Sequence, residues 1–174
     1  MTTSSIFLIG PMGSGKTAVG RHLARLLRLS FYDSDSDIVQ RTGVDIPYIF
    51  EKEGEAGFRV RESETLDRLT QLSGIVLATG GGAVIRVENR RWLAERGTVV
   101  YLKTSVEQQL RRTRHGGHRP LLKNADPEAR LRELMAQRAA LYEEIADITV
   151  STDERKAQSV AQQIQQEIRR VAAP

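Results

Sequence analysis

Residues 6–17 read Ile-Phe-Leu-Ile-Gly-Pro-Met-Gly-Ser-Gly-Lys-Thr, and this stretch decides the expected fold. Its first four residues form a short apolar run, which is typical of a strand buried on both faces of a parallel sheet. The next eight residues match the spacing Gly-x-x-x-x-Gly-Lys-Ser/Thr of a phosphate-binding loop. After the loop, Val19, Leu23, Leu26 and Leu27 recur at helical spacing. Strand, loop and helix therefore follow in the order that phosphate binding requires, and a simple glycine turn is the weaker alternative.

The glycines of this loop allow successive backbone N–H groups to point inward around an anion, and the following helix adds its positive end. Lys16 can reach the β- and γ-phosphates of a nucleoside triphosphate, and the Thr17 hydroxyl can bind the accompanying Mg²⁺. We therefore predict that the chain binds a triphosphate through Gly13, Ser14, Gly15, Lys16 and Thr17.

Three further apolar runs lie at Ile75–Ala78, Val99–Leu102 and Ile148–Val150, and a weaker one is Phe31–Tyr32. Helical patterns separate them, the last over Val160–Val171. Strands that alternate with helices predict βαβ units and a layered α/β fold.

Length and composition describe one ordinary domain. The chain has 174 residues, no cysteine, and no apolar run near the ~20 residues that a membrane helix needs. These features disfavour a disulfide scaffold and a membrane protein, and they are compatible with the cytoplasm. The net charge is +4, and 21 of the 26 basic residues are arginine. The chain has only nine aromatic residues, and its basic residues are scattered along the sequence. Both features weaken the interpretation as a nucleic-acid-binding protein.

Two acidic residues follow the second apolar run. Asp33 and Asp35 are two positions apart, so on an extended segment both point toward the carboxyl end of the sheet, where α/β folds bind ligands. One carboxylate could support Mg²⁺ through water while the other accepts a hydrogen bond from a substrate hydroxyl. The alternative is a helix N-cap with an acidic first turn. No acid ends the strand at Ile75–Ala78, so Asp33 is the expected second metal contact.

Glycines and arginines supply the other candidate residues. Gly80-Gly81-Gly82 follows a predicted strand and removes side chains where a ligand could approach the backbone. Arg138 lies on an apolar helical stripe and needs an anionic partner, either a protein carboxylate or a substrate acid. Arg59 could bind a substrate or form a surface pair with nearby glutamates. Arg119, in a polar loop, could close over the transferring phosphoryl group.

The sequence also narrows the class of triphosphate-binding protein. It lacks the guanine-reading Asn-Lys-x-Asp and the switch Asp-x-x-Gly of GTPases, and it is short for a motor ATPase. A small-molecule kinase fits the length.

Taken together, these motifs resemble the shikimate kinase family over residues 5–168. The phosphate loop alone occurs in many enzymes, but five ordered pieces are specific. They are Gly10–Thr17, Asp33-Ser34-Asp35, Gly54-Glu55 with Phe58-Arg59 and Glu62, Gly80-Gly81-Gly82-Ala83-Val84, and Arg119-Pro120-Leu121-Leu122 followed by Arg138 and Tyr142.

The resemblance implies a nucleoside-monophosphate-kinase-like P-loop fold, a three-layer α/β/α sandwich around a five-stranded parallel sheet. It implies one kinase domain with a core, a helical substrate-binding insert and a lid. The core would comprise 1–33, 74–112 and 124–174, the insert 34–73 and the lid 113–123. The implied activity is ATP- and Mg²⁺-dependent phosphorylation of the shikimate 3-hydroxyl in aromatic amino-acid biosynthesis.

The resemblance also implies roles for individual residues. Asp35 would bind substrate hydroxyls, and Thr17 and Asp33 would serve the metal. Lys16 and Arg119 would stabilise the phosphoryl group. The shikimate contacts would be Asp35, Arg59, Gly80, Gly81, Gly82 and Arg138, and the adenine would lie between Arg112 and Arg155.

Two other functions remain open at this point. A related kinase could act on gluconate or a nucleotide, and the arginine content leaves a nucleotide-dependent nucleic-acid-binding protein as a distant alternative. We expect a cytoplasmic monomer with small-molecule partners, shikimate and ATP, and with neither a nucleic-acid nor a membrane partner.

Overall fold

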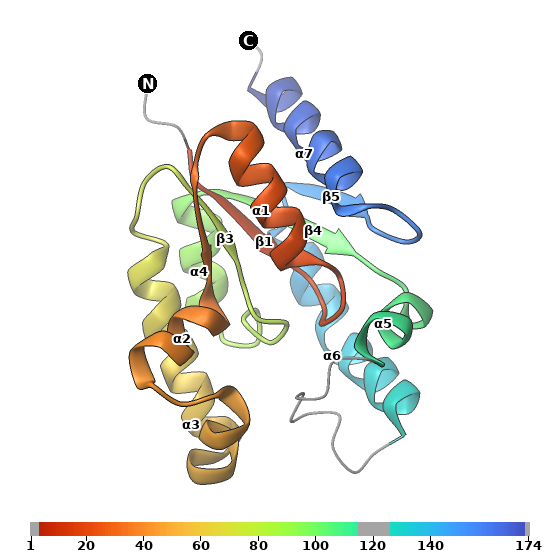
Figure 1. Ribbon diagram of the computed structural model, residues 1–174. Coiled ribbons are helices and arrows are strands. Elements are labelled where there is room, and N and C mark those ends of the chain that lie inside the picture. Colours follow the sequence, from red (N-terminus) through yellow and green to blue (C-terminus); the bar gives the residue numbers. More distant parts are fainter. Residues whose placement is uncertain (1–3, 115–125, 173–174) are drawn as a thin grey trace.

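A five-stranded parallel sheet forms the centre of the computed structural model, which describes residues 4–114 and 126–172 (Figure 1). The strand order is β2-β3-β1-β4-β5. The side chains of β1 and β3 are all buried, as the apolar runs predicted. The strands are β1 (Ile6–Ile9), β2 (Ser30–Asp33), β3 (Ile75–Ala78), β4 (Thr98–Lys103) and β5 (Ile148–Ser151).

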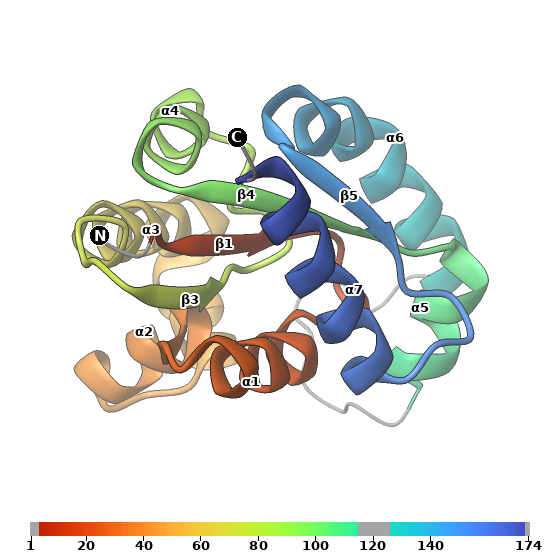
Figure 2. The ribbon, with the colours of Figure 1, turned by 90° about the horizontal axis from the view of Figure 1, so that it is seen from above.

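Helices α1 (Lys16–Leu27) and α7 (Ala157–Val171) cover one face of the sheet (Figure 2). Their apolar stripes, which include Val19, Leu23 and Ile164, pack on Leu8 and Val100. These are the helical patterns read from the sequence, and the spacing of their apolar residues places one side of each helix against the strands.

Helices α3 (Ile46–Leu69), α4 (Val87–Arg96) and α6 (Pro127–Ile145) cover the opposite face. Leu66, Leu93 and Tyr142 from these helices join Phe7 and Tyr101 of the sheet in a second buried cluster. The sheet thus lies between two helical layers, and the predicted α/β fold with five parallel strands is confirmed.

Helix α2 (Ser34–Thr42) and the first part of α3 form a smaller unit beside the carboxyl end of the sheet. Ile38 and Ile49 of this unit pack with Phe58, from the second part of α3, in a separate apolar cluster. Gly54 interrupts α3 with φ 70° and ψ −178°, a conformation that is essentially restricted to glycine. This kink lets the second part of α3 run back along the sheet while the first part stays with α2.

The order of the strands fixes the position of the ligand crevice. The chain passes from β1 to β2 at one edge of the sheet, returns to β3 between these two strands, and then crosses to β4 on the other side of β1. The segment after β1 therefore lies at the topological switch point, where open α/β sheets bind ligands. Helix α5 (Val106–Thr113) lies across the same end of the molecule, beside α6. Within the described part of the chain, no helix is both long and apolar enough to cross a membrane.

Candidate active site

The loop between β1 and α1 has the backbone of an anion cradle. Gly10, Gly13 and Gly15 have φ values of 148°, 76° and 88°, which side chains disfavour. The Lys16 ammonium donates hydrogen bonds to the carbonyl oxygens of Gly10 at 2.7 Å and Pro11 at 2.8 Å. The lysine charge is therefore held inside the loop, within reach of any phosphate that the loop binds.

Thr17 and Asp33 meet beside this loop. The Thr17 hydroxyl donates to Asp33 Oδ2 at 2.7 Å, and Asp33 Oδ1 accepts from the backbone N–H of Ser36 at 3.0 Å. Asp33 therefore caps α2 and also contacts the phosphate loop, so the two interpretations of this residue are compatible. A hydroxyl and a carboxylate side by side are hard oxygen donors that suit Mg²⁺, which keeps several of its waters. The arrangement fits a magnesium ion at the phosphate loop.

Arg112 and Arg155, the two residues expected to flank the adenine, make different contacts. Arg112 donates to the carbonyl oxygens of Gly13 at 3.1 Å and Thr152 at 2.7 Å. Arg155 instead turns toward α7, where it donates to Gln163 Oε1 at 2.5 Å. Arg112 thus joins the phosphate loop to the turn after β5, whereas Arg155 braces that turn against the last helix.

Two carboxylates face each other across Gly80. An ideal Cβ placed on Gly80 would lie 2.8 Å from Glu62 Oε2 and 3.1 Å from Asp35 Oδ1. Within the described residues, both of these buried oxygens lack a hydrogen-bond partner. Burial, followed by the charges of Glu62 and Asp33, raises the pKa of Asp35 to about 7. Burial likewise raises the pKa of Glu62. Asp35 therefore presents a basic oxygen at the carboxyl end of the sheet.

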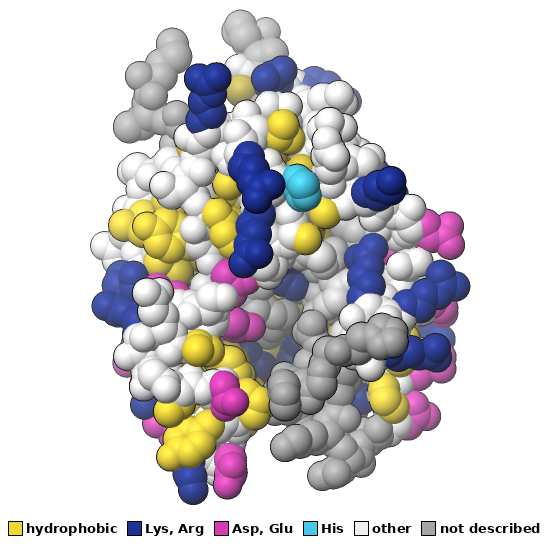
Figure 3. Space-filling model, in the orientation of Figure 1, with side chains coloured by type: hydrophobic (Ala, Val, Ile, Leu, Met, Phe, Trp, Pro, Cys, Tyr) yellow, Lys and Arg dark blue, Asp and Glu magenta, His cyan; other side chains and the backbone are white. Residues whose placement is uncertain are grey.

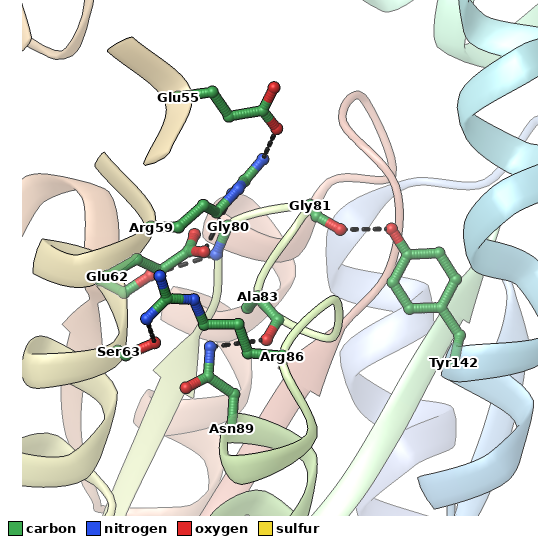
Figure 4. A network of polar contacts seen from close by, with 11 residues as sticks. Glu55, Arg59, Glu62, Ser63, Gly80, Gly81, Ala83, Arg86, Asn89 and Tyr142 are labelled. Carbon is green, nitrogen blue, oxygen red and sulfur yellow. Dashed lines mark hydrogen bonds and ion pairs between the residues drawn. The ribbon is translucent and has the colours of Figure 1, made fainter. Parts of the chain in front are cut away.

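Arg59 is buried beside these carboxylates, with 7% of its surface exposed. It donates to Glu62 Oε1 at 2.9 Å and to Glu55 Oε1 at 3.2 Å (Figure 4). Burial works against its charge, but the two glutamates outweigh burial and the pKa of Arg59 is raised. The pairs anticipated for a surface arginine exist, yet they lie inside the site and orient the guanidinium there.

Arg138 lies on the buried stripe of α6 and is 4% exposed. It forms no ion pair within 4.0 Å among the described residues, and its Nε has no partner there. Its guanidinium lies near the hydroxyl of Tyr142, one turn further along the helix. Burial lowers the pKa of Arg138, and the positive charge of nearby Arg59 adds to this effect.

The three consecutive glycines line this group of charges. An ideal Cβ on Gly82 would lie 2.4 Å from both terminal nitrogens of Arg59, and one on Gly81 would lie 3.7 Å from Arg138 Nη1. A side chain at Gly82 would therefore displace the Arg59 guanidinium. Figure 3 shows the molecule hollowed between the α2–α3 side and the α5–α6 side, with basic side chains inside the hollow.

Known proteins resemble this chain in sequence and in structure. The chain matches the family model for shikimate kinase over residues 12–169. A shikimate kinase from Halorhodospira halophila is 58% identical over 163 residues, which cover 94% of this chain and 92% of that protein. The structure of shikimate kinase from Acinetobacter baumannii in complex with shikimate has a TM-score of 0.97 and 51% identity, and the match covers 99% of this chain and 97% of that one. The chain belongs to the shikimate kinase family.

This membership confirms the predicted family, fold class and enzyme class. The structure of this kinase brings Asp35, Arg59 and Arg138 together around the three glycines, opposite the phosphate loop. Arg119 and the rest of 115–125 lie outside the described residues, so the predicted lid role of Arg119 stays a prediction.

Two residues that hold the site together were not predicted as part of it: Glu62 was expected only as a possible surface partner of Arg59, and Ser34 was given no role. Glu62 orients Arg59, and the Ser34 hydroxyl accepts the N–H of Gly80 at 3.1 Å. The signal for Glu62 was its spacing, because it lies four residues from both Phe58 and Leu66 on the buried side of α3. Ser34 carries no comparable signal, since a serine after a strand equally predicts a helix cap.

Proposed function

We propose that this kinase transfers the γ-phosphoryl group of ATP to the 3-hydroxyl of shikimate, and releases 3-phosphoshikimate and ADP. One observation carries the substrate side of the proposal. The Arg138 guanidinium is buried without an ion-pair partner among the described residues, beside Arg59 and above a glycine loop. A buried cation of this kind calls for an anion with planar, bidentate geometry, and the carboxylate of shikimate supplies it.

Arg59 and Arg138 would hold the shikimate carboxylate, and the ring would lie beside Gly80, Gly81 and Gly82. The hydroxyls at the far side of the ring would then reach Asp35, whose Oδ1 has no partner within the described part of the chain. Fixing both ends of a small rigid molecule determines which hydroxyl faces the nucleotide.

The nucleotide side would be formed by the loop N–H groups of Gly13, Ser14 and Gly15, together with Lys16 and Thr17. Lys16 would exchange its contacts with loop carbonyls for phosphate oxygens when ATP binds. Mg²⁺, held by Thr17 and through water by Asp33, would neutralise part of the triphosphate charge. Arg112 and Arg155 would flank the adenine, and Arg119 would approach the transferred group.

The chemistry requires positioning more than covalent catalysis. As the 3-oxygen of shikimate bonds to the γ-phosphorus, the bond from that phosphorus to the β–γ bridging oxygen breaks. The hydroxyl proton passes to Asp35 Oδ1. A carboxyl whose pKa is raised to about 7 can accept a proton near neutral pH and release it again. Lys16 and Arg119 would stabilise the charge that moves onto the leaving phosphate.

The remaining assignments belong to the same proposal. We infer a cytoplasmic monomer with one kinase domain, comprising core segments 1–33, 74–112 and 124–174, the insert 34–73 and the lid 113–123. The separate apolar cluster of α2 and α3 supports an insert with its own packing.

A coupled assay of ADP release from ATP and Mg²⁺ tests the proposed reaction. Release should depend on shikimate, and the methyl ester of shikimate should be a poor substrate because it lacks the carboxylate charge. Gluconate and nucleoside monophosphates serve as competing acceptors. Equal turnover with either of these, or with the ester, would contradict the substrate assignment.

A further inference from the structure

The loop of residues 80–85 contains the three glycines and leads from β3 into α4. Two hydrogen bonds lie within it. The Ala83 N–H donates to the Gly80 carbonyl at 3.0 Å, and the Ile85 N–H donates to the Gly82 carbonyl at 3.1 Å. The other carbonyl oxygens of the loop accept hydrogen bonds from side chains, and they belong to Gly81, Ala83, Val84 and Ile85. Side chains from outside the loop therefore anchor it at each carbonyl that its own turns leave over.

Two neighbouring residues in the first turn of α4 supply most of these anchors. The Asn89 amide nitrogen donates to the Ala83 carbonyl at 3.0 Å (Figure 4). Arg90 Nη1 donates to the carbonyls of Val84 at 2.8 Å and Ile85 at 3.0 Å. Asn89 is 1% exposed, and its Oδ1 is buried without a partner among the described residues. Because an unpaired buried oxygen is unfavourable, burial alone does not account for an asparagine here, whereas the bond to Ala83 does.

Helix α6 holds the same loop. The Tyr142 hydroxyl donates to the Gly81 carbonyl at 2.5 Å. Arg90 Nε forms an ion pair with Glu144 Oε2 at 2.8 Å. Arg90 therefore contacts both the loop and the helix that carries Arg138. These contacts fix the position of the glycines relative to α6.

The position of the glycines matters because they lie against the charged side chains of the site. An ideal Cβ on Gly82 would lie 2.4 Å from both terminal nitrogens of Arg59, and one on Gly80 would lie 3.1 Å from Asp35 Oδ1. Three successive glycines have no side chains to pack and are conformationally free, so their place depends on anchors at either end. The Ser34 hydroxyl accepts the N–H of Gly80 at one end, and α4 holds the other.

We propose that Asn89 and Arg90 are positioning residues for shikimate binding: they hold the end of the loop, so that the acid meets glycines that are already in place between Arg59 and α6. The inference rests on the proposed function, since it takes shikimate as the molecule that lies beside the glycines. Neither Asn89 nor Arg90 is assigned a contact with the substrate. Without them the loop would sample more conformations, and shikimate would have to order it on binding.

Asn89→Ala tests the role by removing the amide that holds Ala83. We expect calorimetry to show shikimate binding about fivefold more weakly, because ordering the loop then opposes binding. KM for shikimate should rise by a similar factor, while ATP affinity stays at the wild-type value. Ser5→Ala is the matched control, because Ser5 is also buried and donates to a backbone carbonyl, that of Leu72, at the opposite end of the sheet. It should also lower the stability of the fold but leave shikimate affinity unchanged.

Arg90→Met tests the same role at a partly exposed position, where folding does not depend on a buried amide. We expect shikimate affinity to fall by about fivefold or more, since two carbonyls lose their donor. Arg91→Met is its control, because Arg91 is the next residue of α4 and is exposed. That control should bind shikimate like the wild type.

Hydrogen exchange reports on the loop independently of activity. In the free protein, the backbone N–H groups of residues 80–85 should exchange faster in Asn89→Ala and Arg90→Met than in the wild type or the controls, and shikimate should restore their protection. Wild-type exchange of the loop, or wild-type shikimate affinity in both variants, would overturn the inference. An equal loss of shikimate affinity in Ser5→Ala would overturn it too, because lost stability would then explain the effect.

These measurements also separate the inference from the function beneath it. If the wild type binds shikimate and both variants bind it equally well, the positioning role is wrong and the proposed function stands. If the wild type neither binds shikimate nor releases ADP in its presence, the proposed function is wrong, and the positioning role is overturned with it.

Discussion

Replacing Arg138 by methionine should stabilise the free protein while it weakens shikimate binding. Arg138 lies on α6 between Leu134 and Tyr142, in a stripe that is otherwise apolar or aromatic, and it is 4% exposed. It forms no ion pair within the described residues, and burial lowers its pKa. A cation in this position stabilises the complex with an anion but destabilises the protein alone. Methionine has a similar length and adapts to irregular apolar surroundings.

The magnitude follows from two opposing effects. An uncompensated buried charge costs about 3–5 kcal/mol. The substitution also removes the favourable interaction of the guanidinium with the nearby Tyr142 hydroxyl, for which a hydrogen bond to a charged group, about 1.5–3 kcal/mol, is the upper limit. The free energy of unfolding should therefore rise by about 1–2 kcal/mol, a Tm increase of about 2–8 °C for a chain of this size. Loss of the charge pair with shikimate should weaken binding by about thirtyfold or more.

Urea denaturation without ligands measures the first effect, and calorimetry with shikimate measures the second. Arg132→Met is the matched control on the same helix, because Arg132 is exposed and pairs with Glu128 and Glu107. That control should change the free energy of unfolding by less than about 0.5 kcal/mol and leave shikimate binding intact. If Arg138→Met lowered the free energy of unfolding by more than about 1 kcal/mol, the charge would be stabilised in the free protein and the reasoning would fail.

Three further substitutions test other parts of the site. Lys16→Ala should lower kcat by about 10²–10³, as expected for loss of one charge-stabilising donor, with a circular dichroism spectrum like that of wild type; near-normal turnover would contradict its role. Arg119→Ala should lower kcat by a similar factor in the coupled assay, and wild-type turnover would exclude the predicted lid role. Gly82→Ala should raise KM for shikimate more than tenfold with ADP affinity kept, because its Cβ would lie 2.4 Å from the Arg59 nitrogens, which two glutamates hold in place. An unchanged KM would show that Arg59 is free to move.

The parts of this molecule that could be predicted from the sequence are those that depend on local spacing. The phosphate loop follows from residues 6–17 because strand, glycines, lysine and helix are adjacent in the chain, and the buried strands follow from short apolar runs. Arg138 was predicted to need an anion because its apolar neighbours lie within two turns of the same helix. In each case the physical requirement and the residues that meet it belong to one segment.

The parts that could not be predicted depend on contacts between segments. Arg59 was interpreted either as a substrate ligand or as a surface residue, and only the packing of α3 against the glycine loop shows that Arg59 and its pair with Glu62 are buried. Asp35, Glu62 and Gly80 meet in the site, although they come from α2, α3 and the segment after β3. No local sequence pattern connects these three segments. The link from Tyr142 to Gly81 spans 61 positions of the chain and is likewise invisible in the sequence.

Several polar atoms of the site are buried without hydrogen-bond partners, and they destabilise the free protein. Within the described residues, Asp35 Oδ1, Glu62 Oε2 and the Nε atoms of Arg59 and Arg138 are buried and make no hydrogen bond. Each such atom costs about 1–3 kcal/mol, and several gather at one end of the sheet. The wholly buried strands supply the compensating apolar burial at a distance. Groups held in place before the substrate arrives do not have to reorganise during phosphoryl transfer, so the instability of the free site is the physical basis of its selectivity for a hydroxylated acid.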